Sequence, residues 1–363
     1  MSASNLNPSS LPTDAPWNTP WPASELESVS ACPVCGSAAR TVLHEGLIDN
    51  VFFVAPGKWT LHRCAQCSSA YLNSRPTPES IGKAYGTYYT HVAGSSKAPN
   101  FAELGFVRKL RRMMSNGYLN YRYGTQRLPA IALGRWLAKF LPALREVLDL
   151  EFRYLPRPIQ GQRLLDIGCG NGDFLVSARE AGWEVLGIEP DSKAADAARQ
   201  RGLDVTVGTV DLLAGESDCF DAITLSHVIE HVHEPKQLLQ AVQRLLKPGG
   251  VVYIDTPNIN SHGAYLFKKN WRGIEAPRHL VLFNPASLSD LLVATGFDNV
   301  QIKRRTAIRK PIYLSSLRLA AGHSPYGSEP ARLGWFQRAR LSLPFVKTAH
   351  LEFVALSAWK TKR

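Results

Sequence analysis

A glycine-rich turn between an apolar run and a helical pattern constrains this chain more than any other feature. Residues 164–175 read Leu-Leu-Asp-Ile-Gly-Cys-Gly-Asn-Gly-Asp-Phe-Leu, with glycines at 168, 170 and 172. Glycine lacks a Cβ atom, so the backbone can turn sharply there and approach a bound ligand closely. Strand, turn and helix in this order are typical of a nucleotide-like cofactor site at the end of a parallel sheet. We therefore predict an α/β fold with a doubly wound sheet.

Two carboxylates flank this turn and narrow the cofactor class. Asp166 stands just ahead of the glycines, and Glu189 ends the next apolar run, Trp183 to Ile188. A carboxylate at that spacing can accept both ribose hydroxyls of an adenosine. A dinucleotide fingerprint reads Gly-x-Gly-x-x-Gly, whereas this chain has Gly-x-Gly-x-Gly with an acid before it. Such an acid repels a pyrophosphate but suits a cationic ligand with a free amino group.

The turn resembles motif I of the class I S-adenosylmethionine-dependent methyltransferases, and later stretches follow in that family's order. Phe220–Leu225 is similar to the fourth strand, and Leu245–Gly250 to the turn before the fifth, Val251–Asp255. The resemblance spans residues 160–300 and points to the ubiquinone O-methyltransferases and the bacterial small-molecule and sugar methyltransferases. It implies a Rossmann-like sheet, S-adenosyl-L-methionine as cofactor, and cofactor-binding roles for Asp166, Gly168, Gly170, Asn171, Gly172, Glu189, Thr209, Val210 and His227.

One departure from the family concerns the adenine side of the cofactor. The family usually places an acid after the third strand, whereas this chain reads Gly208-Thr209-Val210-Asp211. Thr209 can accept the adenine hydrogen bond, Asp211 can reach it by another loop path, or backbone groups around Val210 can suffice. We expect weaker cofactor binding rather than none.

Four of the six cysteines form two Cys-x-x-Cys pairs, Cys32 with Cys35 and Cys64 with Cys67. Two such knuckles complete a tetrahedral four-thiolate site, so we predict a structural Zn²⁺. The chain shows no secretion signal, which disfavours disulfides. Val51–Val54 and Trp59–His62 look like strands between the pairs, and the assembly resembles a zinc ribbon.

Candidate catalytic groups follow the fourth and fifth strands. His227, Glu230 and His231 share one helical face if a helix starts there. We name His231, Glu230 and His279 as candidates for catalysis. Quinone O-methyltransferases carry Glu-x-x-Glu-His at this place and are thought to bind a divalent cation, so Mg²⁺ is an alternative, and a purely structural role is another.

The stretch after the fifth strand is rich in polar and aromatic residues, where the family places an acceptor-binding segment. Its arginines could bind a carboxylate or a phosphate. The candidates for acceptor contact are Asn258, Trp271, Arg272 and Arg278.

The net charge of +12 is concentrated beside the core. Residues 101–160 hold 11 basic and 4 acidic residues, and residues 300–363 hold 13 and 2. Nucleic acid, an anionic membrane surface and a phosphorylated substrate all fit such flanks, as does plain solvated charge. Phe106–Met114 and Leu128–Leu150 combine basic and apolar residues at helical spacing, which favours peripheral membrane contact. No RNA-module signature accompanies them.

We divide the chain into a disordered leader (1–29), a zinc ribbon (30–75), a helical connector (76–158) and a methyltransferase domain (159–363). That domain has an insertion at about 306–350, after which Leu351–Lys360 return as the last strand. The chain has neither a secretion signal nor an apolar run long enough to cross a membrane, so we expect a cytoplasmic protein, with the inner membrane face as a peripheral location.

Three functions fit these observations. The first is S-adenosylmethionine-dependent O-methylation of a small molecule or of a glycan or lipid-linked sugar precursor. The second is RNA base methylation, although the Cys-x-x-x-His knuckle of such enzymes is absent. The third is a catalytically inactive binding protein of the same fold.

Overall fold

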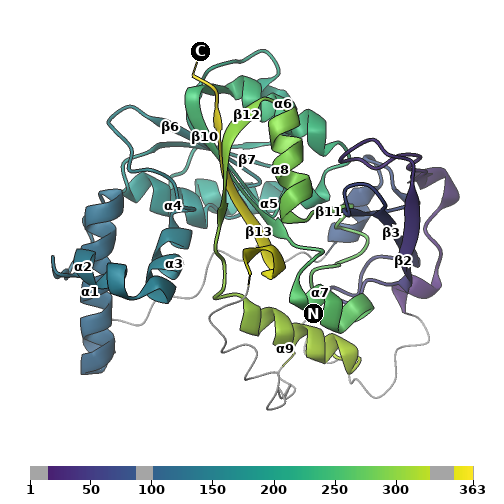
Figure 1. Ribbon diagram of the computed structural model, residues 1–363, viewed down its shortest axis with the longest axis horizontal. Coiled ribbons are helices and arrows are strands. Elements are labelled where there is room, and N and C mark those ends of the chain that lie inside the picture. Colours follow the sequence, from purple (N-terminus) through teal and green to yellow (C-terminus); the bar gives the residue numbers. More distant parts are fainter. Residues whose placement is uncertain (1–14, 87–100, 328–346, 363) are drawn as a thin grey trace.

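The computed structural model describes residues 15–86, 101–327 and 347–362. Its centre is a seven-stranded sheet with the order β12-β13-β10-β9-β6-β7-β8 (Figure 1). The five strands from β10 to β8 are parallel, and β13 runs antiparallel to both β10 and β12. The strands are β6 (Arg163–Ile167), β7 (Glu184–Glu189), β8 (Val205–Val207), β9 (Phe220–Ser226), β10 (Leu246–Pro257), β12 (Phe297–Lys303) and β13 (Phe353–Lys360). The predicted doubly wound α/β fold is confirmed, as are the fourth, fifth and last strands.

Chain order reverses between β6 and its two neighbours, β7 and β9. In open α/β sheets, ligands bind outside the carboxyl ends of the strands at such a switch point. Asp166 and Ile167 end β6 there, directly before the glycine turn.

Two hydrophobic clusters cover the two faces of the sheet, because successive strand residues point to opposite sides. Leu165 and Ile223 belong to one cluster, and their neighbours Leu164 and Ala222 to the other. The first cluster contains buried residues of α6 (Pro235–Leu245) and α8 (Pro285–Ala294). The second contains residues of α4 (Asp173–Glu180) and α5 (Ser192–Arg199).

The cysteine-rich module forms an antiparallel sheet of β2 (Arg40–Leu47), β3 (Trp59–Cys64) and β4 (Ala70–Leu72). A strand from the other part of the chain, β11 (Val281–Leu282), extends this sheet by pairing with β4. A second, two-stranded sheet joins β1 (Leu26–Glu27) to β5 (Arg75–Pro76). The ribbon is therefore continuous with the segment that follows the fifth core strand.

Two expectations about this module are wrong. Val51–Val54 is a turn rather than a strand, because the buried Asp49 carboxylate accepts the backbone N–H groups of Phe52, Val54 and Ala55. Residues 15–29 are not a disordered leader. Trp17 and Trp21 are buried, and the Trp21 ring lies 5.4 Å from the Trp59 ring. Residues 1–14 lie outside the described part of the chain.

The connector contains α1 (Phe106–Tyr123), α2 (Gly134–Phe140) and α3 (Pro142–Glu151). The helix predicted at Phe106–Met114 is confirmed, whereas the second span divides into two helices at Leu141. These helices lie at the opposite side of the sheet from the ribbon (Figure 1). Tyr118 and Tyr123 both donate hydrogen bonds to Asp149, over 2.6 and 2.8 Å, which fixes α1 to α3.

Two helices complete the fold, α7 (His262–Phe267) after β10 and α9 (Arg309–Ala320) after β12. α9 lies in the predicted insertion, whose residues 328–346 are outside the described part of the chain. Among the helices of the described ranges, none is both long and apolar enough to cross a membrane.

Candidate active site

The glycine turn and Glu189 form one hydrogen-bonded unit at the end of the sheet. Glu189 ends β7, and its carboxylate accepts the backbone N–H of Gly170 over 2.7 Å and that of Asp191 over 3.0 Å. Burial raises the pKa of the Glu189 carboxyl, and these two hydrogen bonds oppose the rise. A carboxylate offers about four lone-pair sites, so two remain for ligand hydroxyls.

Asp166 is completely buried beside this turn. Its Oδ1 accepts a hydrogen bond from Thr224 over 2.8 Å and pairs with the guanidinium of Arg153. Its Oδ2 is buried without a hydrogen-bond partner. Burial raises the pKa of this carboxyl, and the Arg153 charge opposes the rise. An unpaired buried acceptor at this place fits a ligand that brings a polar hydrogen.

The three glycines of the turn have positive φ angles of 70°, 55° and 78°. A Cβ atom at Gly168 would lie 2.5 Å from a Val228 methyl, so packing excludes one. At Gly170 a Cβ would meet no atom within 4 Å, so the space there is open to a ligand. Gly168 is therefore required by packing, whereas Gly170 borders open space.

The remaining predicted cofactor residues lie around the same edge. Asn171 is part of the turn, and its side-chain oxygen accepts the N–H of Asp173 over 3.2 Å. Thr209 is exposed and donates its hydroxyl hydrogen to Asp211 over 2.7 Å, while Val210 is buried. The two alternatives for the adenine side, Thr209 and Asp211, are therefore a single hydrogen-bonded pair.

The three candidate catalytic residues come together on the other side of β9. Glu230, His231 and His279 bring one ligand atom each within 4.8 Å of one another. The His231 and His279 rings lie 4.8 Å apart in an edge-to-face arrangement. The expected common helical face is absent: His227 has a φ of 57°, and only Ile229–His231 form a short 3₁₀ turn. Hydrogen bonding still joins His227 to Glu230 over 3.3 Å.

His231 is held by two partners from different parts of the chain. Its Nδ1 lies 3.1 Å from the carbonyl oxygen of Arg278 and 3.0 Å from the hydroxyl of Tyr85. A carbonyl only accepts, so this network assigns the proton to Nδ1 and leaves Nε2 as the basic nitrogen. Burial lowers the pKa of His231 to about 4, assisted by the neighbouring His279. The ring is therefore neutral at pH 7, with an unprotonated Nε2.

This cluster does not fit Mg²⁺, which prefers octahedral oxygen ligands. Two imidazoles and one carboxylate suit softer divalent metals instead. Glu230 is also occupied by Thr256, which donates to its Oε2 over 2.9 Å.

Sequence reasoning missed several groups of this site. Arg305 pairs with Asp255 and lies 4.3 Å from the Phe353 ring, so it covers the end of β10. Arg153 lies 3.7 Å from the Phe174 ring beside the glycine turn. Neither arginine belongs to a motif, because each comes from a connecting segment that chain folding brings to the sheet edge.

Three of the four residues predicted to contact the acceptor are buried and bonded to other parts of the protein. Asn258 donates to the carbonyls of Ala349 and Leu351 over 2.9 and 2.8 Å, and Trp271 donates to Glu352 over 2.8 Å. Arg278 is fully buried against Asp49 and Glu275.

The fourth, Arg272, pairs with Glu275 and donates to the Tyr326 hydroxyl over 2.6 Å. Burial of the first three disfavours direct contact with an acceptor, and that role stays a prediction for all four.

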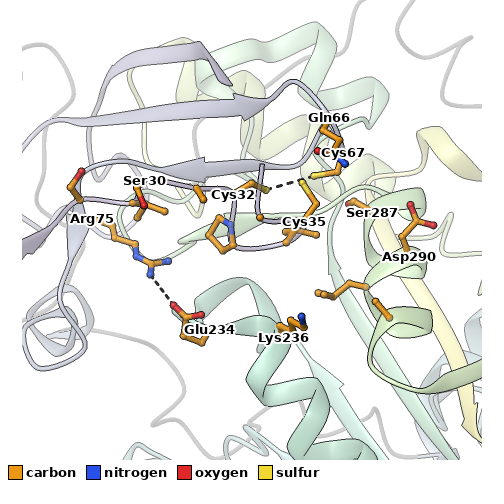
Figure 2. A pocket seen from close by; sticks show the side chains of 18 of the residues that line it. Ser30, Cys32, Cys35, Gln66, Cys67, Arg75, Glu234, Lys236, Ser287 and Asp290 are labelled. Atoms are coloured by element: carbon orange, nitrogen blue, oxygen red, sulfur yellow. Dashed lines mark hydrogen bonds and ion pairs between the residues drawn. The ribbon is translucent and has the colours of Figure 1, made fainter. Parts of the chain in front are cut away.

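The four knuckle cysteines converge on one point. The sulfur of Cys32 lies 3.7 Å from that of Cys67, and the sulfur of Cys35 lies 3.5 Å from that of Cys64. Figure 2 shows three of these side chains at the wall of a cavity of about 800 Å³, opposite α6 and α8.

Comparison with known families identifies the central part of the chain. A family model described as a methyltransferase domain matches residues 134–302. Residues 134–302 are therefore similar to a methyltransferase domain. The match includes the glycine turn, Glu189 and the Glu230–His231 pair, whereas Tyr85, Arg305 and the knuckle cysteines lie outside it.

Curated relatives of the methyltransferase domain are named ubiquinone biosynthesis O-methyltransferase. The protein of Paracidovorax citrulli is 34% identical over 150 residues, covering 34% of this chain and 62% of that protein. The protein of Cereibacter sphaeroides is 34% identical over 160 residues, covering 41% and 65%. The chain thus spans less than two thirds of the length of these relatives.

Two solved structures are also similar. One is an S-adenosylmethionine-dependent methyltransferase of Thermotoga maritima titled a possible histamine N-methyltransferase, with 22% identity and a TM-score of 0.40. It covers 62% of this chain and 97% of that one. The other is a phosphoethanolamine N-methyltransferase of Haemonchus contortus, with 20% identity and a TM-score of 0.44, covering 68% and 60%.

Proposed function

We propose that this chain transfers a methyl group from S-adenosylmethionine to a hydroxyl oxygen of a small molecule. The observation that carries the proposal is the pair of buried carboxylates, Asp166 and Glu189, on either side of a glycine turn with open space at Gly170. Asp166 Oδ2 would accept a hydrogen from the amino group of the cofactor. Glu189 would accept the ribose hydroxyls, and the Thr209–Asp211 pair would face the adenine.

The bound cofactor supplies an electrophilic methyl group on a sulfonium. The protein orients the acceptor and removes the hydroxyl proton as the new carbon–oxygen bond forms. His231 is our candidate for that base, because its ring is neutral and Nε2 is unprotonated in the assigned network. Glu230 and His279 would orient it.

The acceptor class is supported by the relatives, whose names give an O-methyltransferase of ubiquinone biosynthesis. A hydroxylated ring and a glycan or lipid-linked sugar both offer the required hydroxyl. The test uses methyl-labelled S-adenosylmethionine with a bacterial extract separated into small molecules, lipid-linked glycans and RNA. We expect label in one of the first two fractions and a loss of roughly 10²- to 10⁴-fold in rate for His231→Gln. Label in the RNA alone would contradict the proposal.

We also propose that the cysteines hold one structural Zn²⁺. Zinc–sulfur bonds of about 2.3 Å in a tetrahedron place sulfurs about 3.8 Å apart, close to the spacings of 3.7 and 3.5 Å. Four thiolates leave no open ligand position, so the ion would stabilise structure rather than catalyse. Metal analysis should give one ion per chain, lost in Cys64→Ser.

Peripheral membrane contact is supported by the connector. The helix α1 carries five Lys and Arg and no acidic residue, and Phe106 and Val107 are 81% and 76% exposed at its start. Phe140 of α2 is 78% exposed. Cations beside exposed apolar side chains fit an anionic bilayer surface. In sedimentation with phosphatidylglycerol vesicles, the wild-type protein should be found in the vesicle pellet. The double variant Phe106→Ser/Phe140→Ser should stay in the supernatant, whereas the control Leu212→Ser should sediment like wild type. Equal sedimentation of both variants would contradict this contact.

A further inference from the structure

The segment 275–284, which we call the acceptor segment, lies between the cysteine ribbon and the catalytic cluster. On one side, Leu72 of β4 donates its N–H to the carbonyl of Leu280 over 3.0 Å. On the other side, Leu280 donates its own N–H to the carbonyl of Glu230 over 2.8 Å. One residue thus connects the ribbon sheet to the catalytic turn through backbone hydrogen bonds alone.

A buried ion pair makes a second connection. The guanidinium of Arg278 pairs with Asp49 of the ribbon and donates to the carbonyl of Ala84 over 2.8 Å. Both charged side chains are completely buried, so each depends on the other for compensation. Since the carbonyl of Arg278 also accepts from His231, this pair fixes the backbone that orients the candidate base.

A third connection starts at the cysteine knuckle itself. Asn284 is the N-cap of α8, where its oxygen accepts the N–H of Ser287 over 3.0 Å. Its amide group donates to the carbonyl of the knuckle residue Cys67 over 2.9 Å. Elsewhere the knuckle and α8 face each other across the cavity of Figure 2, whose wall includes Ser287 and Asp290. Asn284 therefore links the knuckle to the start of α8.

Hydrophobic packing also joins the ribbon to the acceptor segment. The ribbon residues Trp59 and Leu61 share one buried cluster with Leu280 and Phe283 of the acceptor segment. Cys169 of the glycine turn belongs to the other cluster. The same cluster as the ribbon contains Ile167, which directly precedes the glycine turn, so apolar packing joins the ribbon to both sides of the site. The acceptor segment is distinguished instead by its backbone hydrogen bonds, its ion pair with Asp49 and the Asn284–Cys67 contact.

We propose that the metal-bound ribbon positions the acceptor segment, so that metal loss releases residues 275–284 and His279 while the cofactor turn stays formed. The ribbon then supports the active site structurally and is not a separate module for binding nucleic acid. The inference rests on the zinc site and the acceptor-side roles proposed above.

Hydrogen exchange of the full chain tests it without any acceptor. Metal is removed with a chelator, its removal is checked by elemental analysis, and exchange is compared peptide by peptide. We expect exchange in 275–284 to accelerate by at least roughly tenfold, and that in 164–175 to change less than about twofold. Re-addition of Zn²⁺ should restore the original rates. Unchanged exchange in 275–284 would overturn the proposal, as would equal acceleration of both peptides in a metal-free protein that stays folded by circular dichroism.

Asn284→Ser decides the matter if the metal-free protein unfolds throughout. Serine keeps an N-cap oxygen for α8 but is too short to donate to Cys67. We expect this variant to retain one Zn²⁺, to bind S-adenosylhomocysteine within about twofold of wild type and to exchange faster in 275–284. Wild-type protection of 275–284 in the variant would overturn the proposal. Because S-adenosylhomocysteine binding is read separately, loss of cofactor affinity in the wild-type protein would instead contradict the proposed function.

Discussion

The carboxylate of Glu189 accepts the backbone N–H of Gly170 over 2.7 Å, joining the end of β7 to the turn that follows β6. This contact makes the cofactor side of the site one unit, because the carboxylate that would bind the ligand also sets the path of the glycine turn. Changes at either residue should therefore affect cofactor binding.

Replacing Glu189 by Gln should weaken binding of S-adenosylhomocysteine by roughly 10- to 150-fold. The estimate corresponds to the loss of about 1.5–3 kcal/mol that a hydrogen bond to a charged group contributes. Isothermal titration calorimetry measures the effect. The control is Glu184→Gln, an exposed position at the start of the same strand, which should bind as wild type. Equal affinities for both variants would contradict the assignment of Glu189.

Alanine at two glycines of the turn should act differently. Gly168→Ala places a methyl group against Val228 at a φ of 70°, so we expect destabilisation of roughly 1–3 kcal/mol. Gly170→Ala meets open space, so it should reduce cofactor affinity with a smaller loss of stability. Gly215→Ala, with nothing within 4 Å and no positive φ, is the neutral control. Urea unfolding and calorimetry separate the two effects, and identical profiles for both turn variants would be inconsistent with this interpretation.

Stability should fall as the pH drops from about 6.5 toward 4. Burial lowers the pKa of His231 to about 4, whereas the unfolded chain keeps the ordinary value near 6.5. Between these values the unfolded state takes up a proton that the folded state refuses, so the free energy of unfolding decreases. At about 1.4 kcal/mol per pKa unit, the difference of about 2.5 between these two pKa values limits the loss to roughly 3.5 kcal/mol.

Urea unfolding at pH 7 and at pH 4.5 measures that loss. His231→Gln should show a smaller decrease than wild type across this range, while the exposed His350→Gln should show the wild-type decrease. A variant without His231 that loses as much stability as wild type would refute the assignment.

Breaking the ion pair between Asp49 and Arg278 should destabilise the protein strongly. Asp49→Ala leaves a buried guanidinium without its main partner, at a cost of roughly 3–5 kcal/mol. The double variant Asp49→Leu/Arg278→Met removes both charges and should recover a large part of that loss. Thermal unfolding of the two proteins gives the comparison, and a double variant less stable than the single one would contradict it.

The sequence predicted those features whose residues lie close together in the chain. The glycines at 168, 170 and 172 and the Cys-x-x-Cys spacing predicted the sheet edge and the sulfur cluster, because both depend on residues close together in the chain. The Asn284–Cys67 and Arg278–Asp49 contacts could not be predicted, since their partners lie about two hundred residues apart in the chain and carry no pattern.

The errors have the same origin. Trp17 and Trp21 lie in a stretch whose Ser, Pro and Asn content suggested disorder, yet packing against the ribbon outweighs that local composition. Val51–Val54 has the residue types of a strand, but the buried Asp49 carboxylate organises it as a turn. For Arg278 the acceptor contact stays a prediction, but its buried partner Asp49 could not be predicted from the sequence.

Calorimetric titration of the full chain with S-adenosylmethionine tests the central claim most directly. We expect one binding site per chain and no detectable binding for Asp166→Ala, whose folding is checked by circular dichroism. A wild-type chain that binds no S-adenosylmethionine, or an Asp166→Ala variant with wild-type affinity, would contradict the account.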